Sequence, residues 1–184
     1  EFCLALAGAG LAITSGLARG IDGAAHAAAL EAATPTIAVC ATGLDEVYPP
    51  RHRALAARIA AEGALVSEFP PGTPARAPHF PQRNRIIAGL ALGILVVEAG
   101  LRSGSLITAR LAGEYGREVY AIPGSIHHPM ARGCHRLIRD GARLVEGVDE
   151  VLDGLGPLAQ ALGADIAGRL ARAAATPVRP AATA

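Results

Sequence analysis

Residues 93–110 read GILVVEAGLRSGSLITAR, an apolar run followed by a Gly- and Ser-rich turn and then a stretch of helical length. The same order, a short apolar run and then an Ala-, Leu- and Arg-rich stretch, recurs along the chain. The apolar runs lie at residues 11–15, 36–41, 64–68, 93–98, 118–123 and 142–146. Strands that alternate with helices are typical of a parallel sheet covered on both faces. The pattern predicts a doubly wound α/β fold with a mostly parallel sheet.

The two ends of the chain depart from this pattern. Residues 2–9 read as the end of a helix with no strand before it, so we expect the sheet to lack its first strand. Residues 1–153 are expected to form the α/β domain, truncated at its N-terminus. From residue 154 onward Ala and Gly dominate, which predicts a linker or tail that is partly helical through Arg172 and disordered over residues 176–184.

Composition limits the class of protein. Of the 184 residues, 51% are hydrophobic and 18% are charged, which predicts one folded core rather than disorder. No apolar run reaches the roughly 18 residues that span a bilayer, and the first ten residues do not have the pattern of a signal peptide. Cys3, Cys40 and Cys134 fit neither a disulfide framework nor a zinc ribbon. We therefore expect a cytoplasmic protein with no membrane partner and no cofactor.

Charge is unevenly distributed along the chain. Residues 1–50 carry one Arg against five acidic residues, residues 51–143 carry thirteen against six, and residues 144–184 carry three against five. All 17 basic residues are Arg, the residue that binds phosphate in a bidentate manner. The basic middle segment favours a polyanionic partner.

Two strand-to-helix loops have the composition of a phosphate site, which in parallel sheets lies beyond the carboxyl ends of the strands. In SGLARGID (15–22), Gly16 and Gly20 permit close approach and Arg19 supplies a cation, although a plain turn with Asp22 capping the helix is the alternative. The loop within residues 98–110 offers the backbone and hydroxyl of Gly104 and Ser105, with Thr108 and Arg110 one turn further. It could also be a simple helix cap. It is neither a Walker loop nor GxGxxG, which disfavours nucleoside triphosphate hydrolysis.

Two further segments concentrate polar residues. Arg83, Asn84 and Arg85 lie near the start of a helix expected from about Gln82, where the helix dipole favours a bound anion. Arg83 and Arg85 are about 200° apart around the helix axis, so we expect one to face the pocket and the other to pair with an acid. Phe80 beside them either stacks on a base or anchors the loop in the core. The remaining segment, residues 123–135, contains His127, His128, Cys134 and His135, whose spacing matches no common metal site.

Six segments, in this order, resemble the DNA-processing protein A family (DprA, also called Smf). They are SGLARGID (15–22), GLDEVYPP (43–50), PQRNRIIAGL (81–90), VVEAGLRSGSLITAR (96–110), YAIPG (120–124) and LIRDGA (137–142), within a match over about residues 2–153. The resemblance implies an extended Rossmann-like fold that binds single-stranded DNA, dimerises and helps to load the recombinase RecA during natural transformation, without catalysis. Together with the loop chemistry it gives these site residues: Arg19, Gly20, Arg83, Asn84, Arg85, Gly104, Ser105, Thr108 and Arg110.

The sequence also departs from this family in three ways. The family's opening strand, followed by a loop with Ser and Arg, is absent from these residues. Many members have a helical domain before the fold and a winged-helix domain after it, which the 184 residues do not include. His135 stands where many relatives have Asn in a GxNxLI motif. We expect the first departure to remove one phosphate contact.

Two other functions and an oligomeric state remain open from the sequence. Nucleotide phosphoribohydrolases resemble this fold and have a PGGxGTxxE loop, but here Thr108 stands three residues after Ser105, where their Glu acts, and Thr cannot carry that charge or proton. A domain that binds a mononucleotide is the second alternative. A homodimer is expected from the resemblance and from an apolar group near the end of the domain: Leu137, Ile138, Val148, Val151 and Leu152.

Overall fold

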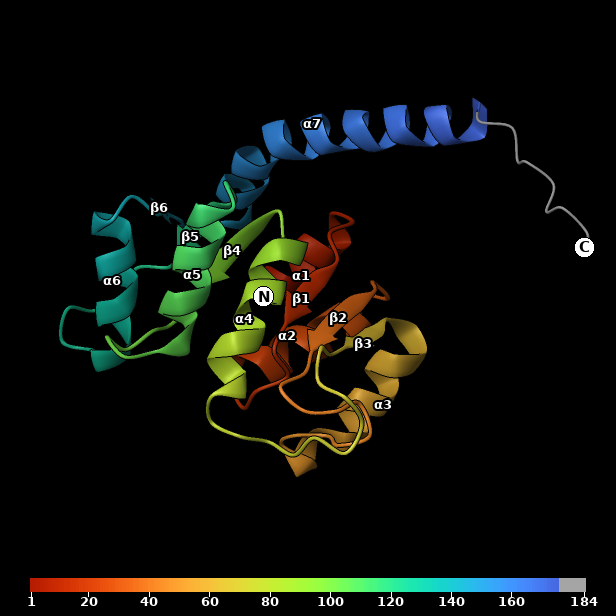
Figure 1. Cartoon of the computed structure of the whole chain (residues 1–184). Helices are drawn as coiled ribbons and strands as arrows, with labels where there is room; N and C mark the ends of the chain where they lie inside the picture. The colour runs from red at the N-terminus through yellow and green to blue at the C-terminus, as the bar shows by residue number, and fades with distance from the viewer. Residues whose placement is uncertain (176–184) are drawn as a thin grey trace, which may run out of the picture.

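The structure, a computed structural model, describes residues 1–175. Within them the strands are β1 (Ile13–Ser15), β2 (Thr36–Val39), β3 (Ala64–Val66), β4 (Gly93–Val96), β5 (Glu118–Ala121) and β6 (Arg143–Leu144). The α-helices are α1 (Phe2–Gly8), α2 (Ile21–Glu31), α3 (Arg53–Glu62), α4 (His79–Leu90), α5 (Gly104–Glu114), α6 (Arg132–Arg139) and α7 (Val148–Ala175). Every apolar run singled out in the sequence contains a strand, so the predicted alternation of strands and helices is confirmed (Figure 1).

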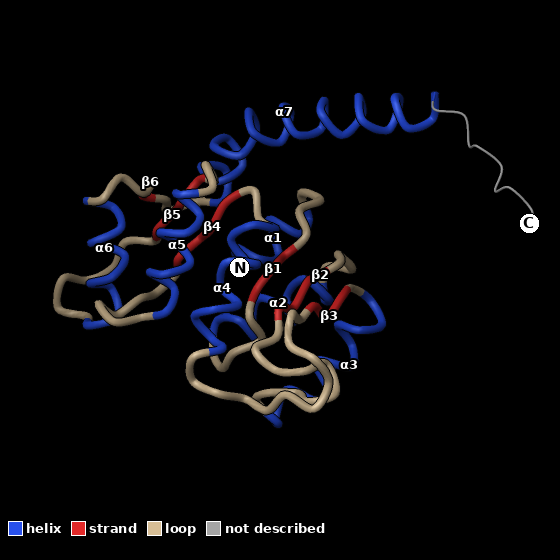
Figure 2. The backbone as a smooth tube through the Cα atoms, in the orientation of Figure 1, coloured by secondary structure: helices blue, strands red, loops and turns tan. Residues whose placement is uncertain are grey.

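The strands form two parallel sheets of three strands each. One has the order β1-β2-β3, with Ile13 opposite Thr36, and the other has the order β4-β5-β6, with Gly93 opposite Glu118. The α/β class and the parallel pairing are as predicted, but the single sheet is divided. In the described part of the chain no ladder of hydrogen bonds joins β1 to β4. These two strands are the inner edges of the sheets (Figure 2).

The apolar side chains gather in three clusters. One covers the first sheet and includes Leu17, Ala38 and Ile59. Another covers the second sheet and includes Val96 and Cys134. The last, made of Leu6, Tyr120, Val145, Val151 and Leu155, joins helices α1 and α7 to the second sheet. Because α1 also contacts α2 and β1, it connects the first sheet to the second.

Helix α7 crosses the predicted domain boundary without a break. Glu150 accepts hydrogen bonds from the backbone N–H groups of Glu146 and Gly147 at 2.6 and 3.0 Å, which fixes the start of the helix. Leu155 and Val151 are buried in the core, and Val148 and Leu152 pack against them. Their apolar character is thus explained by the core, as it is for Leu137 and Ile138 of α6. The predicted tail at residues 176–184 lies outside the described residues, and the division into two parts stays a prediction.

A Pro-rich loop over residues 69–78 leads into α4. Asp45 accepts hydrogen bonds from the backbone N–H of Gly72 at 2.9 and 2.8 Å, and Gly43 N–H donates to Thr73 O at 3.0 Å. Helix α4 begins at His79, three residues before the expected start, because Pro81 is tolerated in the first turn of a helix. None of the helices within residues 1–175 is both long and apolar enough to cross a membrane.

Candidate functional site

A cavity of about 770 Å³ opens at the carboxyl ends of β1 and β4. Six of the nine residues predicted for the site line it: Arg19, Arg83, Asn84, Gly104, Ser105 and Thr108. They come from three segments that are distant in the sequence, namely the loop before α2, the first turns of α4 and the start of α5. The fold therefore brings the three predicted loops to one place.

The loop before α2 is held by its own carboxylate. Asp22 Oδ2 accepts hydrogen bonds from the backbone N–H groups of Gly16 and Ala18 at 3.2 and 3.0 Å, and no side chain caps α2. The loop adopts positive φ at Leu17 (59°) and Gly20 (83°), and the buried Leu17 side chain anchors it. The alternative of Asp22 as a helix cap is wrong, because its carboxylate turns back to the loop. What the loop offers to a ligand is the exposed Arg19 side chain.

Arg83 lies behind the mouth of the cavity with only 4% of its surface exposed. Its Nη1 donates hydrogen bonds to Gly16 O at 2.8 Å and to Val39 O, and its Nε donates to Asn84 Oδ1 at 3.1 Å. Burial lowers the pKa of the guanidinium, and Asp22 partly offsets this. Arg83 therefore ties together the carboxyl ends of β1 and β2 and gives the cavity a buried positive charge.

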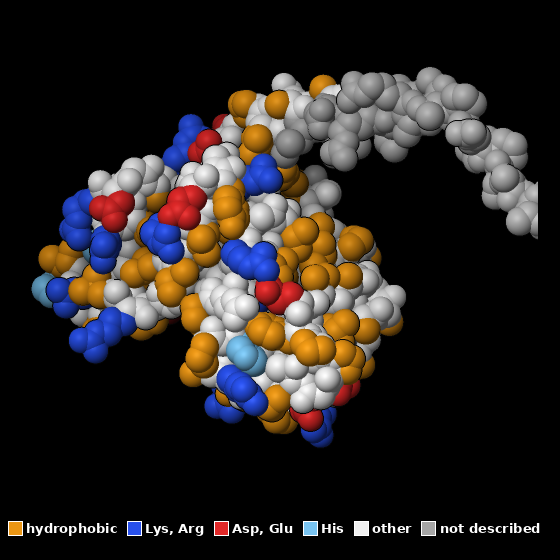
Figure 3. Space-filling model, in the orientation of Figure 1, with side chains coloured by type: hydrophobic (Ala, Val, Ile, Leu, Met, Phe, Trp, Pro, Cys, Tyr) orange, Lys and Arg blue, Asp and Glu red, His pale blue; other side chains and the backbone are white. Residues whose placement is uncertain are grey.

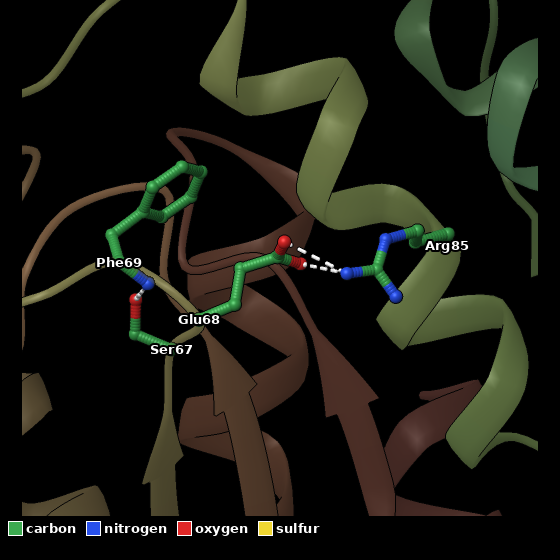
Figure 4. Close-up of polar contacts among 4 residues, drawn as sticks. All are labelled: Ser67, Glu68, Phe69 and Arg85. Carbon is green, nitrogen blue, oxygen red and sulfur yellow. Dashed lines mark hydrogen bonds and ion pairs between the residues drawn. The ribbon is translucent and has the colours of Figure 1, made fainter.

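Arg85 points away from the cavity and pairs with an acid, as expected for one member of the Arg83 and Arg85 pair. Its Nη2 lies 2.7 Å from both carboxylate oxygens of Glu68 (Figure 4). Glu68 is held next to a local turn in which Phe69 N–H donates to Ser67 Oγ at 3.0 Å. Arg85 thus lies outside the lining of the cavity, because its position around α4 turns it toward β3, and its part in phosphate binding stays a prediction.

The N-terminus of α5 presents small polar groups to the cavity. Ser103 is the N-cap, whose Oγ accepts the N–H of Ser105 at 3.4 Å and lies 2.7 Å from Ser105 Oγ. Asn84 Nδ2 donates to Gly104 O at 3.3 Å, which links α4 to α5. Thr108 is buried, and its hydroxyl lies 3.5 Å from Gly104 O. The dipole of α5 favours an anion at this N-terminus. Ser103 was not among the predicted site residues, although the Ser-x-Ser spacing indicates a cap.

Two other predicted residues lie off the cavity. Arg110 follows Ser105 by five residues, about 140° around the helix axis, and pairs with Glu114 on the exposed side of α5. It lines a second cavity of about 740 Å³ between α5 and α6 and does not line the cavity that Ser105 borders, so its part in phosphate binding stays a prediction. Gly20 supplies the positive φ beside Arg19 but does not line the cavity.

Two carboxylates at the cavity repel anions. Asp22 is occupied by two loop amides, whereas Glu98, which follows β4, is exposed at the lining. Glu98 was not among the predicted site residues, although its place just after a strand, at the edge of the sheet where the site lies, was a usable signal. Glu98 and Asp22 lower the positive potential that Arg19 and Arg83 create.

A buried histidine lies beneath the loop before α2. His26 is 0% exposed, and its Nδ1 lies 2.7 Å from Thr36 Oγ1, which itself donates to Ile13 O at 2.6 Å. Because that hydroxyl has one hydrogen, His26 Nδ1 is the donor and Nε2 is unprotonated. Burial, together with the positive charges of His52 and Arg83, lowers the pKa of His26 to about 4, although Asp22 raises it.

The structure also shows where Phe80 and the histidine-containing segment at residues 123–135 lie. Phe80 lines the cavity, with the edge of Tyr48 at 5.4 Å between ring centroids and the Arg83 guanidinium 6.0 Å from its ring centroid. His135 Nε2 lies 2.9 Å from Gly124 O, which holds the loop before α6. Over the described residues, no group of three or more His, Cys, Asp or Glu side chains is placed to hold a metal ion.

Comparisons with known proteins identify the family of the chain. The sequence model of a family described as DNA recombination-mediator protein A matches residues 1–156. The chain is 57% identical to Protein Smf of Escherichia coli over 155 residues, 84% of this chain and 41% of that protein. It is 53% identical to DNA processing protein DprA of Streptococcus pneumoniae over 142 residues, 77% of this chain and 50% of that protein. The chain thus spans about half the length of these curated relatives or less.

Solved structures show the same fold. The X-ray structure of DprA from S. pneumoniae has a TM-score of 0.77 at 48% identity and covers 83% of this chain and 54% of that one. A structure of DprA from Helicobacter pylori, described by its single-stranded DNA binding mode, has a TM-score of 0.75 at 28% identity, with coverage of 84% and 70%. The chain belongs to the DNA recombination-mediator protein A family, whose members are also named DprA and Smf.

Proposed function

We propose that this chain binds the phosphate backbone of single-stranded DNA at the mouth of the cavity between β1 and β4. One observation carries the proposal: Arg19, the Asn84 amide and the N-terminus of α5 converge there from both sheets, with the buried Arg83 charge behind them. Guanidinium groups, hydroxyls and backbone N–H groups bind phosphate rather than base edges. We therefore expect little sequence selectivity.

The position of Phe80 at the cavity favours a single strand over a duplex. The Phe80 ring lines the same cavity as the polar groups, so it is available to stack on an unpaired base. A duplex keeps its bases stacked inside, where Phe80 cannot reach them. The H. pylori relative, whose structure is described by its single-stranded DNA binding mode, supports this choice.

The wider role follows from the family. We propose that the bound strand is passed to the recombinase RecA in natural transformation and recombination, that the protein acts in the cytoplasm, and that it forms a homodimer. The family is described as a recombination mediator, which supports the proposed transfer of the strand to a recombinase. Sedimentation equilibrium tests the dimer: a single monomeric species at tens of micromolar contradicts it for this chain.

We propose binding without catalysis. The phosphoribohydrolase alternative needs a carboxylate one turn into α5, where this chain has the buried Thr108 hydroxyl bonded within its own helix. Glu98 is an exposed carboxylate at the lining of the same cavity. The phosphoribohydrolase alternative therefore needs a direct test. Incubation with adenosine monophosphate is expected to release no adenine. If adenine is released, and the Glu98→Gln variant no longer releases it, a purely binding role is contradicted.

Fluorescence anisotropy tests the proposed function. The chain is titrated onto a labelled oligothymidylate of about 20 nucleotides and onto a duplex of equal length, at several salt concentrations. We expect tighter binding to the single strand and an affinity that falls as salt rises, because each neutralised phosphate releases counterions. Equal affinity for both forms, or an affinity independent of salt, contradicts the proposal. Binding of adenosine monophosphate without DNA binding favours the mononucleotide alternative.

A further inference from the structure

The second cavity, between α5 and α6, carries more positive charge than the first cavity, at the carboxyl ends of β1 and β4. The lining of the first cavity has two arginines and two carboxylates, whose formal charges cancel. Arginine side chains gather over α5 and α6, with acidic side chains between them (Figure 3). The lining of the second cavity has a formal charge of +2, from four arginines and two carboxylates: Arg102, Arg110, Arg117, Arg136, Glu118 and Asp140.

Two of these arginines are paired with acids close by in the sequence. Arg110 pairs with Glu114 on the exposed side of α5. Arg136 Nε lies 3.5 Å from Asp140 Oδ2, at the end of α6. Both are pairs between residues four positions apart, so in each of them the acid offsets the charge of its arginine.

The other two arginines, Arg102 and Arg117, have donors that the protein does not use. Arg102 is exposed, and it has no acidic partner among the described residues. Arg117 is half-buried, and its Nη2 donates a hydrogen bond to Gly89 O at 3.4 Å. Its Nε is buried without a hydrogen-bond partner in the described part of the chain. A guanidinium has five N–H donors, so both residues can still bind an oxyanion.

The second cavity follows the length of α5. Its lining includes residues of this helix from the N-cap Ser103 to Gly113, a span of about 16 Å. Arg102 lies at one end of this span, and Arg117 follows the other end in the sequence. Successive phosphates of one strand of a duplex are about 3.4 Å apart along the axis. The cavity is therefore long enough for more than one phosphate.

The two cavities meet at the first turn of α5. Ser103 and Ile107 line both of them. A DNA strand with a phosphate at the N-terminus of α5 therefore lies next to the second cavity, on the side where Arg102 precedes Ser103. This continuity favours the DNA strand over an acidic peptide as the occupant.

We propose that the second cavity binds further phosphates of the DNA strand that leaves the first cavity, with Arg102 and Arg117 as their ligands. The inference rests on the proposed function, because the strand reaches α5 through the first cavity. Phosphate contacts carry no base information, so the second cavity lengthens the bound segment without adding sequence selectivity.

Strand length separates the contributions of the two cavities. The native chain, Arg102→Ala, Arg117→Ala and the double variant are titrated onto labelled oligothymidylates of about 6 and about 16 nucleotides, within the site sizes of single-stranded DNA-binding folds. Fluorescence anisotropy gives the affinity at several salt concentrations. The matched control is Arg58→Ala, which removes the same charge from α3, outside the lining of both cavities. Urea denaturation checks that each variant folds, and the exposed Arg102 carries the test alone if Arg117→Ala does not.

The long strand should respond and the short strand should not. We expect the double variant to bind the long strand about tenfold more weakly than Arg58→Ala does, with a salt slope lower by about 1.4 for two lost phosphate contacts. Arg102→Ala alone should show about half of the change in salt slope. The short strand, which the first cavity holds, should bind the double variant and the control equally well.

Four outcomes would overturn the inference. In the first, the double variant binds the long strand as the control does, which leaves the proposed function intact. In the second, the affinity falls equally for both lengths, so the two arginines act at the first cavity or through the fold. In the third, the native chain binds neither strand, and the proposed function fails as well. In the fourth, a labelled hexaglutamate binds the native chain but not the double variant, whose DNA binding is unchanged, which favours an acidic peptide.

Discussion

Arg83 donates a hydrogen bond to the carbonyl oxygen of Gly16 at 2.8 Å, and its guanidinium occupies the place where a side chain on residue 16 would stand. A Cβ built on Gly16 meets Nη2 and Cζ of Arg83 at distances that real Cβ atoms do not adopt. The close approach of this buried cation favours glycine at position 16. The backbone N–H of Gly16 donates to Asp22 Oδ2 at 3.2 Å, and its carbonyl oxygen accepts the hydrogen bond from Arg83.

Replacing Arg83 by Ala is expected to destabilise the fold. The change leaves the carbonyl groups of Gly16 and Val39 without their donor, and lost buried hydrogen bonds from a charged group cost about 2–4 kcal/mol in total. Urea denaturation followed by circular dichroism measures this. The matched control is Arg85→Ala, which removes only a half-exposed ion pair with Glu68 and should cost less than about 1 kcal/mol. Equal losses for both variants would contradict the structural role of Arg83.

Gly16→Ala is expected to act through Arg83. Alone, it should lower the free energy of unfolding because the new methyl group displaces the guanidinium. In the double variant with Arg83→Ala the obstacle is gone, so the double variant should lose at least about 1 kcal/mol less than the two single losses added. A double-mutant cycle by urea denaturation gives the coupling. Additive losses would show that the two residues do not interact.

The free energy of unfolding should fall as the pH is lowered from 7 to 5. The pKa of His26 is about 4 in the folded chain against 6.5 unfolded, so the unfolded state binds more protons in this range and gains stability as the pH drops. The groups around the ring are Asp22, His52 and Arg83. From these pKa values the loss between pH 7 and pH 5 is about 2 kcal/mol. Urea denaturation at both pH values of the native chain and of His26→Gln separates this residue from the other histidines, because the variant should lose most of the pH dependence.

Removing the exposed carboxylate at the site should strengthen DNA binding. Glu98 borders the cavity, and its charge repels phosphate, so Glu98→Gln is expected to raise the affinity for single-stranded DNA about threefold at low salt and less at high salt. The control is Glu114→Gln, which makes the same charge change on a residue outside this cavity. A similar gain in both variants would point to net charge rather than to the site.

The sequence predicted the strands and helices well because apolar runs and Gly or Pro punctuation are local signals. It could not predict that Asp22 turns back to the loop amides, since a helix cap has the same local pattern. The sequence also did not show that Arg110 lies outside the cavity that Ser105 borders, because the side of α5 that faces the cavity depends on how the helix is rotated against the sheet. The tie from Arg83 to Gly16 and Val39 joins residues 67 and 44 positions apart, which no local pattern reveals.

The central claim is that the DNA phosphate binds at the mouth of the cavity, and Arg19 tests it most directly. Arg19 is exposed at the cavity. Arg110 carries the same charge but lies on α5 outside the lining of this cavity, where it pairs with Glu114. Anisotropy titrations with single-stranded DNA over a range of salt are compared for Arg19→Ala and Arg110→Ala. We expect Arg19→Ala to cost about 1–3 kcal/mol of binding and to reduce the salt slope by about one, with Arg110→Ala close to the native chain. Unchanged affinity and salt slope in Arg19→Ala, or an equal loss in both variants, would contradict the site.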